Sequence, residues 1–400
     1  MFADKDYILS LRREIHEYPE IGFDLPKTIS VVKRELDKLG IEYTEKYSES
    51  SVVATINPEK SHFTIGIRAD MDALLIEEKT DLPFKSKIKG QMHACGHDAH
   101  TAMLLGTAKV LKEMEDKISC RVMLVFQPSE EGIRSGAEEL VKGGLMEEID
   151  IIIGLHIENW IDSGKIGICK GNSMASCRNF ELEFFGYTAH ASLPQTGKDA
   201  LAAAVGTYNG IQTMLTRKVD PFARYICSVG RFEAGTTQNV IADYAKMLGT
   251  IRTYDLKLDK MIIENIEDIA RKSAENFGCT CKVTTNLLDA VVYNNPEISD
   301  LVLVSAKKVI GEENITEMPI KMSSEDFANY LLEKPGVFIR LGTRNVEKGC
   351  TTLPHNNDFM MDEDALPVGT DVSVQFVLDN MNGIDMEKVC ASDERSKSSD

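Results

Sequence analysis

The chain has 400 residues, of which 43% are hydrophobic and 27% charged, a composition typical of globular proteins with room for two domains. Its 45 Lys and Arg residues against 63 Asp and Glu residues give a net charge of −18, which repels nucleic-acid backbones and anionic membrane surfaces. We therefore expect neither a nucleic-acid partner nor a membrane partner.

The first part of the chain, residues 1–178, alternates amphipathic stretches with short apolar runs. The amphipathic stretches predict helices at 5–17, 26–39, 99–114 and 135–146, and the apolar runs predict strands at 52–56, 63–67, 121–127 and 150–156. Short apolar strands separated by helices are typical of an α/β domain whose sheet is buried on both faces. We therefore predict a central mixed, largely parallel sheet.

The pattern changes between residues 179 and 290. Strands are predicted at 179–186, 225–233, 243–252 and 279–287, and helices at 198–215 and 255–277. The resulting β-α-β-β-α-β order matches the split βαβ motif of a ferredoxin-like α+β domain, which we expect to be inserted as a unit. Residues 291–384 then complete the first domain, and the polar, Ser-rich tail at 385–400 is predicted to be disordered.

Nine cysteines are spread along the chain without the spacing of a small disulfide-bonded domain, which favours a reducing compartment. The chain does not open on a basic and apolar leader, and its apolar runs are too short to span a membrane. These features predict a cytoplasmic protein.

The sharpest local motif is MHACGHDAH at residues 92–100, which gathers one cysteine, three histidines and an aspartate. Thiolate and imidazole are preferred ligands of zinc and related divalent ions. Cys95 and His97 are two residues apart, so a regular helix would point them to different faces. We expect a loop before the helix at 99–114 to bring both to one ion; a loop that is merely polar is the alternative.

A second motif, QPSEEG at residues 127–132, places Glu130 and Glu131 directly after a predicted strand. Glu pairs also occur at 77–78, 138–139, 147–148 and 312–313, where solvated surfaces explain them. The pair at 130 and 131 differs in position, because ligands of open α/β sheets collect at the carboxyl ends of strands. One carboxylate of this pair can bind a metal ion while its neighbour acts as a base.

Other strand ends carry further metal-compatible side chains. His156 ends the apolar run DIIIGLH, and Asp70 and Asp72 follow the run that ends at Ile67. A single histidine after a strand is usually structural, but several strand ends that converge favour a site. His355, far downstream, gains interest because the C-terminal segment returns to the same domain.

The chain resembles the M20 metallopeptidase clan. The motifs that carry this resemblance are RREIHEYPEIGF (12–23), RADMDAL (68–74), MHACGHDAH (92–100), QPSEEG (127–132), GLH (154–156), NVIAD (239–243), GTIRTYD (249–255), SSEDF (323–327) and LPHNNDF (353–359). Within the clan, the match is to the amidohydrolase branch with hippurate hydrolases, bacterial aminoacylases, N-acetyldiaminopimelate deacetylase and plant auxin-conjugate hydrolases. The resemblance extends to about residue 380.

The resemblance implies metal-dependent hydrolysis of the amide bond of a small N-acyl amino acid, with two divalent ions per subunit. Mn or Zn is favoured over Co or Ni. The implied ligands are Cys95, His97, Glu131, His156 and His355, with Cys95 bridging the two ions. Glu130 is the implied general acid/base, which takes a proton from the attacking water and returns it to the leaving nitrogen.

In the inserted domain, His190 resembles the family's histidine that stabilises the oxyanion, and Asn239 and Arg252 resemble its residues around the substrate carboxylate. In several relatives this lid domain also forms the dimer contact and lends its histidine to the partner's active site. The resemblance therefore implies a homodimer through residues 179–290.

The sequence departs from the family pattern at Gln195, Ala242 and Pro354, which puts substrate preference and pocket shape in doubt but removes no proposed ligand. His16, Asp70, Asp72 and Glu325 match family motifs and are assigned support roles. Two alternatives stay open: a non-catalytic protein that binds acylated amino acids, and a thiol hydrolase with Cys95 as nucleophile.

Overall fold

The computed structural model describes residues 2–60 and 62–393, which form two compact units. The first unit takes in the described residues up to Ser173, Val292–Ile320, and the described residues from Asp326 onward. The second takes in Met174–Val291 and Lys321–Glu325. Each unit is described by itself.

The first unit contains an eight-stranded sheet of order β1-β2-β4-β3-β5-β14-β6-β13. The strands are β1 Glu42–Thr44, β2 Val52–Ile56, β3 Thr64–Asp70, β4 Arg121–Gln127, β5 Ile151–Asp162, β6 Ile166–Ile168, β13 Ile315–Glu317 and β14 Gly336–Arg344. The central pairs β4-β3, β3-β5 and β5-β14 are parallel, whereas β1-β2, β2-β4 and β14-β6 are antiparallel. The predicted mixed α/β sheet is thus confirmed.

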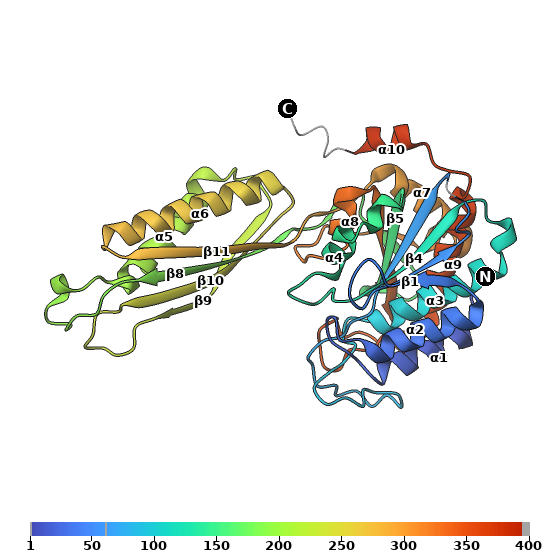
Figure 1. The fold of residues 1–400 in the computed structure, drawn as a ribbon, viewed down its shortest axis with the longest axis horizontal. Coiled ribbons are helices and arrows are strands. Elements are labelled where there is room, and N and C mark those ends of the chain that lie inside the picture. Colours follow the sequence, from blue (N-terminus) through green and yellow to red (C-terminus); the bar gives the residue numbers. More distant parts are fainter. Residues whose placement is uncertain (1, 61, 394–400) are drawn as a thin grey trace. The chain divides into compact units, whose positions relative to one another are not determined.

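Helices surround this sheet. They are α1 Lys5–His16, α2 Pro26–Leu39, α3 His97–Glu113, α4 Gly136–Lys142, α7 Pro296–Ile310, α8 Ala328–Glu333, α9 Leu366–Asn380 and α10 Met386–Ser392. α1, α2 and α3 lie side by side in Figure 1, and α3 packs against β3. All seven residues of β3 are buried, as expected for a strand in the middle of a covered sheet.

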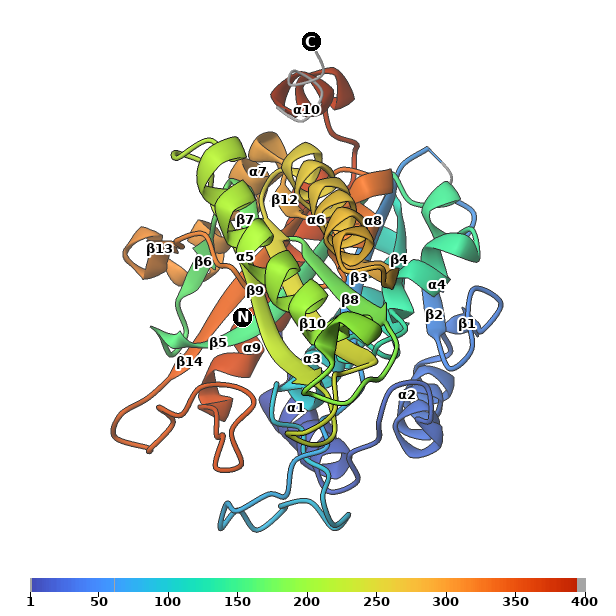
Figure 2. The ribbon, with the colours of Figure 1, turned by 90° about the vertical axis from the view of Figure 1, so that its left-hand side faces the viewer.

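The second unit contains a four-stranded antiparallel sheet of order β11-β8-β10-β9, with two helices on one of its faces (Figures 1 and 2). Its elements are β8 Cys177–Phe185, α5 Ala200–Lys218, β9 Tyr225–Ala234, β10 Tyr244–Thr253, α6 Leu256–Asn276 and β11 Thr280–Asp289. The predicted β-α-β-β-α-β order is therefore confirmed.

Short elements escaped prediction because three or four residues carry little periodic signal. Besides β1, β6 and β13, they include the paired strands β7 Gly171–Met174 and β12 Val292–Asn294, and the 3-10 turns η1 Glu115–Lys117, η2 Leu145–Glu147, η3 Pro194–Thr196, η4 Glu312–Asn314 and η5 Glu363–Ala365. The segment Lys321–Glu325 lies in the second unit, whereas the sequence placed it in the first domain. Hydrogen bonds from Ala175 N to Lys321 O and Ser323 O hold it there.

The prediction of disorder from residue 385 was wrong for residues 386–392, which form α10. Asp385 caps this helix by accepting a hydrogen bond from Lys388 N, and Val389 is fully buried. Residues 394–400 lie outside the described residues. Within the described part of the chain, no helix combines the length and apolar character that a membrane crossing requires.

Candidate metal centre and active site

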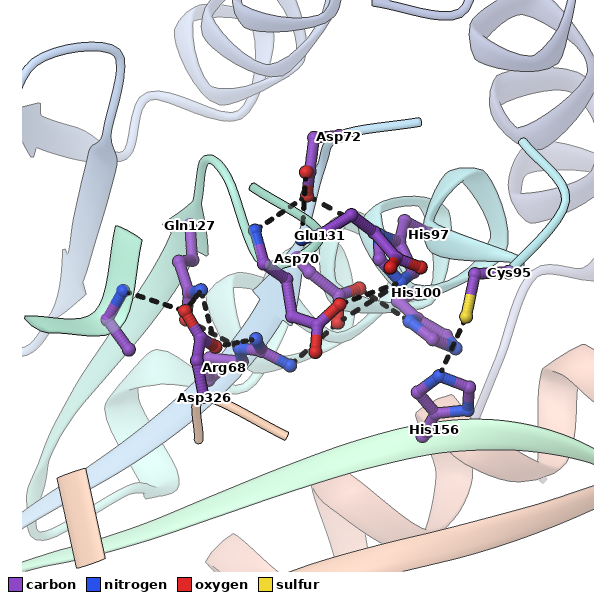
Figure 3. A network of polar contacts seen from close by, with 12 residues as sticks. Arg68, Asp70, Asp72, Cys95, His97, His100, Gln127, Glu131, His156 and Asp326 are labelled. Carbon is purple, nitrogen blue, oxygen red and sulfur yellow. Dashed lines mark hydrogen bonds and ion pairs between the residues drawn. The ribbon is translucent and has the colours of Figure 1, made fainter. Parts of the chain in front are cut away.

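The carboxyl ends of three parallel strands meet at one edge of the large sheet. β3 ends at Asp70, β4 leads into Glu130 and Glu131, and β5 carries His156. The loop with Cys95 enters α3 beside them, as Figure 3 shows. Parallel neighbours necessarily end at the same edge, so strand order alone brings these side chains together.

Cys95, His97 and His156 form a buried inner group, defined by one donor atom from each residue within 4.8 Å of the others. Cys95 Sγ lies 3.4 Å from His156 Nε2 (Figure 3). His156 Nδ1 lies 2.5 Å from Ile157 O, and because a carbonyl only accepts, Nδ1 carries the proton. Nε2 of neutral His156 is therefore the nitrogen with a lone pair for a metal ion.

Cys95 also belongs to an outer group with Glu131 and His355, again with one donor atom each within 4.8 Å. His355 Nε2 lies 3.0 Å from Glu131 Oε1. The outer group is less buried, because 53% of the His355 side chain is exposed. Two groups that share one cysteine suit two neighbouring divalent ions with a bridging thiolate.

His97 provides the clearest test of fit to a metal ion. The residue is completely buried, and neither ring nitrogen has a hydrogen-bond partner among the described residues. Burial lowers its pKa, but Asp70, Asp72 and Glu131 together raise the pKa of His97 to about 10. Buried imidazoles normally have hydrogen-bond partners. A buried imidazole that has none and is surrounded by carboxylates therefore fits a cation site.

The Cys95 thiol has the opposite electrostatic environment from that of a catalytic nucleophile. Burial, Glu131 and Glu130 raise the pKa of Cys95 well above its usual value. Reactive cysteines instead have a lowered pKa and positive surroundings. Without a cation, Cys95 is held as a neutral thiol, which argues against the thiol-hydrolase alternative.

Asp72 positions the two glutamates. Its two carboxylate oxygens accept hydrogen bonds from Glu130 N at 2.9 Å and Glu131 N at 3.1 Å. Its Oδ1 also lies 3.5 Å from His97 Nδ1. Ser129, just before the pair, has a left-handed φ of 53°, a strained conformation of the kind that concentrates at functional sites. These contacts are consistent with the support role expected for Asp72, because they fix the backbone of Glu130 and Glu131 beside His97.

A buried polar network braces this edge of the sheet. Arg68 donates to Asp70 at 2.7 Å, to Asp326 at 3.0 Å and to Gln127 at 2.8 Å (Figure 3). Sequence reasoning assigned no role to Arg68, Gln127 or Asp326. The sequence feature that could have indicated these roles is an arginine inside the buried strand β3, because a buried guanidinium requires carboxylate partners.

His100 is close enough to be a ligand, since Asp70, His97 and His100 each offer one donor atom within 4.8 Å of the others, but its contacts favour a support role. Its Nδ1 lies 2.5 Å from Asp70 Oδ1, and its Nε2 accepts a hydrogen bond from Ile157 N at 2.9 Å. Both ring nitrogens are therefore engaged. His100 therefore differs in role from Cys95 and His97, its neighbours in the same motif.

His16 joins α1 to the start of α3. Its Nδ1 lies 2.8 Å from Asp98, and its Nε2 lies 3.3 Å from Glu78. Burial and Arg12 lower the pKa of His16, but Asp98 and Glu78 outweigh them and raise it above 6.5. Because ionised carboxylates only accept hydrogen bonds, the two carboxylates that face its ring nitrogens favour the imidazolium form of His16.

We expect His16→Gln to destabilise the protein by roughly 1.5–3 kcal/mol at a pH below 6.5, because Asp98 and Glu78 each lose a charged hydrogen-bond donor. Asp98 keeps its ion pair with Arg12 at 2.7 Å, and Glu78 keeps its hydrogen bond from Ser86 N. The folded-state pKa of His16 is raised, so its contribution is fully present below the unfolded pKa. The contribution is lost as the pH rises through the folded pKa. Thermal unfolding of wild type and variant across this range measures the difference, and a gap that does not narrow at alkaline pH would show that His16 is folded in neutral form.

The remaining predicted residues lie in the second unit. His190 and Asn239 are neighbours there, because Ala191 N donates to Asn239 O at 3.0 Å. Arg252, on β10, donates from Nη1 to Met322 O at 3.3 Å. The roles of these three residues towards the metal centre stay predictions.

The sequence profile of peptidase family M20/M25/M40 matches residues 66–379. The chain is 38% identical over 370 residues to thermostable carboxypeptidase 1 of Saccharolobus solfataricus, covering 91% of this chain and 93% of that protein. It is 35% identical over 359 residues to the N-acetyl-L-cysteine deacetylase of Bacillus subtilis, covering 90% and 84%. Among solved structures, a Bacillus subtilis protein described as a dinuclear metal-binding peptidase of the M20 family has a TM-score of 0.78 and 31% identity, covering 94% and 97%.

Proposed function

This chain belongs to peptidase family M20/M25/M40 and is a metal-dependent amidohydrolase, and we propose that it hydrolyses small N-acyl amino acids to a carboxylic acid and a free amino acid. The observation that carries the proposal is the pair of ligand groups that share Cys95, with Glu130 beside them. The N-acetyl-L-cysteine deacetylase relative, named for an N-acyl amino acid, supports the substrate class.

In this proposal Cys95, His97 and His156 hold one divalent ion, and Cys95, Glu131 and His355 hold the other. Mn or Zn is expected ahead of Co or Ni, because thiolate, imidazole and carboxylate together suit these ions and availability decides between them. When bound, the ions polarise the amide carbonyl and make water acidic enough to attack it at neutral pH.

Glu130 is assigned the proton transfers. It would accept a proton from the attacking water and return it to the leaving nitrogen, a task for a carboxylate within hydrogen-bond reach of both. The hydrogen bond from its own backbone N–H to Asp72 fixes where this side chain starts. A role for Glu130 as a ligand is the alternative, since His97, Glu130 and Glu131 also offer donor atoms within 4.8 Å of one another.

His190 is assigned to the oxyanion. Ser192 N donates to His190 Nδ1 at 3.1 Å, so this nitrogen is an acceptor and the proton of neutral His190 is on Nε2. The Nε2–H group is then the donor that can stabilise developing negative charge. Asn239 and Arg252 are assigned to the substrate carboxylate, which the guanidinium of Arg252 can bind through two parallel hydrogen bonds.

The second unit supports the proposed homodimer. β9 is an edge strand of ten residues, with exposed Ile226 and Phe232. Such an edge offers unpaired backbone groups to another chain, and a two-fold axis would pair it with the same strand of a second copy. We propose that His190 then acts in the active site of the partner subunit.

Mixing His190→Ala with Glu130→Gln under conditions of subunit exchange should restore activity. Each mixed dimer would contain one site with both residues intact and one site with neither. Random exchange makes half the dimers mixed and half of their sites functional, so we expect roughly a quarter of wild-type activity. Native mass spectrometry would verify the exchange. Exchange without recovered activity would place His190 in the site of its own chain.

A panel of acetyl, benzoyl and longer-chain acyl amino acids, tested on the metal-loaded protein, examines the substrate class. The proposal expects at least one member to be cleaved at its amide bond. Cleavage of unblocked peptides alone, with every acyl amino acid refused, would contradict it.

The proposed location is the cytoplasm. All nine cysteines lie within the described residues and are free thiols in the structure. Dispersed free thiols are typical of reducing compartments, which supports this location.

A further inference from the structure

The inner and outer ligand groups rest on different kinds of structure. His97 begins α3 and His156 lies on β5, so two of the three residues of the inner group are held by regular elements, and all three are buried. His355 lies in the segment 352–360, which has no helix or strand. Its backbone also has a left-handed φ of 65°, which is costly for a residue other than glycine. The outer group therefore depends on what fixes this segment.

One buried side chain ties both ends of that segment together. Asn159, only 1% exposed, donates from Nδ2 to Thr352 O at 2.7 Å and to Met360 O at 2.8 Å. Its Oδ1 accepts a hydrogen bond from Thr343 Oγ1 at 2.6 Å, which fixes the orientation of the amide. Asn159 thus anchors the loop with His355 to β5, three residues beyond His156.

The centre of the segment has separate contacts with the rest of the site. His355 N donates to Ala94 O at 2.8 Å, and Lys79 N donates to Asn357 O at 2.7 Å. These are single backbone hydrogen bonds in a partly exposed loop. Without the Asn159 anchor, the partly buried carbonyls of Thr352 and Met360 would lose this partner, and the loop would gain conformational freedom that must be lost again before His355 can meet Glu131.

We propose that Asn159 is a positioning residue for the ion held by Cys95, Glu131 and His355, and that this outer ion is bound more weakly than the inner one and is lost first. The inference rests on the ligand set of the proposed function. The inner ion keeps Cys95, His97 and His156 when the loop moves. The outer ion takes one ligand, His355, from a partly exposed segment without helix or strand, so part of its binding free energy is spent on ordering that segment.

The test is Zn2+ binding, measured as zinc per chain after equilibration against graded free Zn2+ in a metal buffer. Wild type should fill in two separated steps, with the outer step at the higher free Zn2+. Asn159→Ala should move the outer step to about tenfold to 100-fold higher free Zn2+, the usual effect of removing a residue that orients a ligand. The inner step should stay within about twofold.

Two further variants keep the result interpretable. Asn57, directly after β2, also donates its side-chain amide to two backbone carbonyls, those of Glu115 at the start of η1 and of Ile118, so Asn57→Ala should shift neither step. Thr343→Val removes only the hydroxyl that holds the Asn159 amide, so it should shift the outer step in the same direction by less. It carries the test if Asn159→Ala fails to fold.

A shift of both steps by the same factor, or of neither, in Asn159→Ala and Thr343→Val would overturn the inference. His355→Ala separates this failure from failure of the proposed ligand set. If that variant loses the outer step while Asn159→Ala leaves it in place, only the anchoring role falls. If His355→Ala keeps both steps, the ligand set is wrong and the inference falls with it.

Discussion

Glu130→Gln should lower kcat by roughly 10²- to 10⁴-fold while the protein keeps its fold and its metal ions. Glutamine has nearly the same shape as glutamate but cannot take up a proton at neutral pH, so both proton transfers lose their carrier. The backbone hydrogen bond from residue 130 to Asp72 is unaffected by the substitution. Turnover and metal content measured on the same preparation check this expectation.

The adjacent residue provides the matched control. Glu131→Gln makes the same chemical change one position along, but we expect it to lower metal content. Glu131 is a proposed ligand, and its Oε1 lies 3.0 Å from Nε2 of His355, a proposed ligand of the same ion. Excess metal should partly restore its activity. The opposite pattern, with metal lost in Glu130→Gln and retained in Glu131→Gln, would exchange the two roles.

Removing the metal ions should abolish activity, and Mn2+, Zn2+ or Co2+ should restore it. Free water has a pKa near 16, and the proposed site lowers that value towards about 7 only with its ions in place. Burial and the nearby carboxylates raise the pKa of Cys95, and the carboxylates raise the pKa of His97 against the effect of burial, so the metal-free site is expected to hold protons where the ions would bind. Metal analysis after chelation must accompany each rate. Full activity with metal verified as absent would contradict a metal-dependent reaction.

Much of the site could be predicted because its residues follow regular elements. Glu131 lies just after β4, His156 lies on β5, and Cys95 lies in the loop that enters α3. Parallel strands end at one edge, so local patterns were enough to suggest that these side chains meet. The inserted α+β unit was predictable for a similar reason, since its strands and helices are long and strongly periodic.

The supporting residues could not be predicted in the same way. Arg68 pairs with Asp326, 258 positions away, and Asn159 reaches Thr352, 193 positions away. Such partners are chosen by tertiary packing, which leaves no periodic trace in the sequence. The helix α10 was missed because one buried valine and one capping aspartate were enough to order a polar segment. Motif resemblance indicated which residues matter, and only the structure showed what each one contacts.

The most direct test of the account measures both products from an acyl amino acid of the panel, using metal-loaded and metal-free wild-type protein. We expect the metal-loaded protein to release carboxylic acid and free amino acid in equal amounts over many turnovers, and the metal-free protein to release neither. Binding of the acyl amino acid without release of either product would instead indicate a non-catalytic binder. Release that persists without metal and stops on thiol alkylation would indicate a thiol hydrolase, and either result would contradict the proposed function.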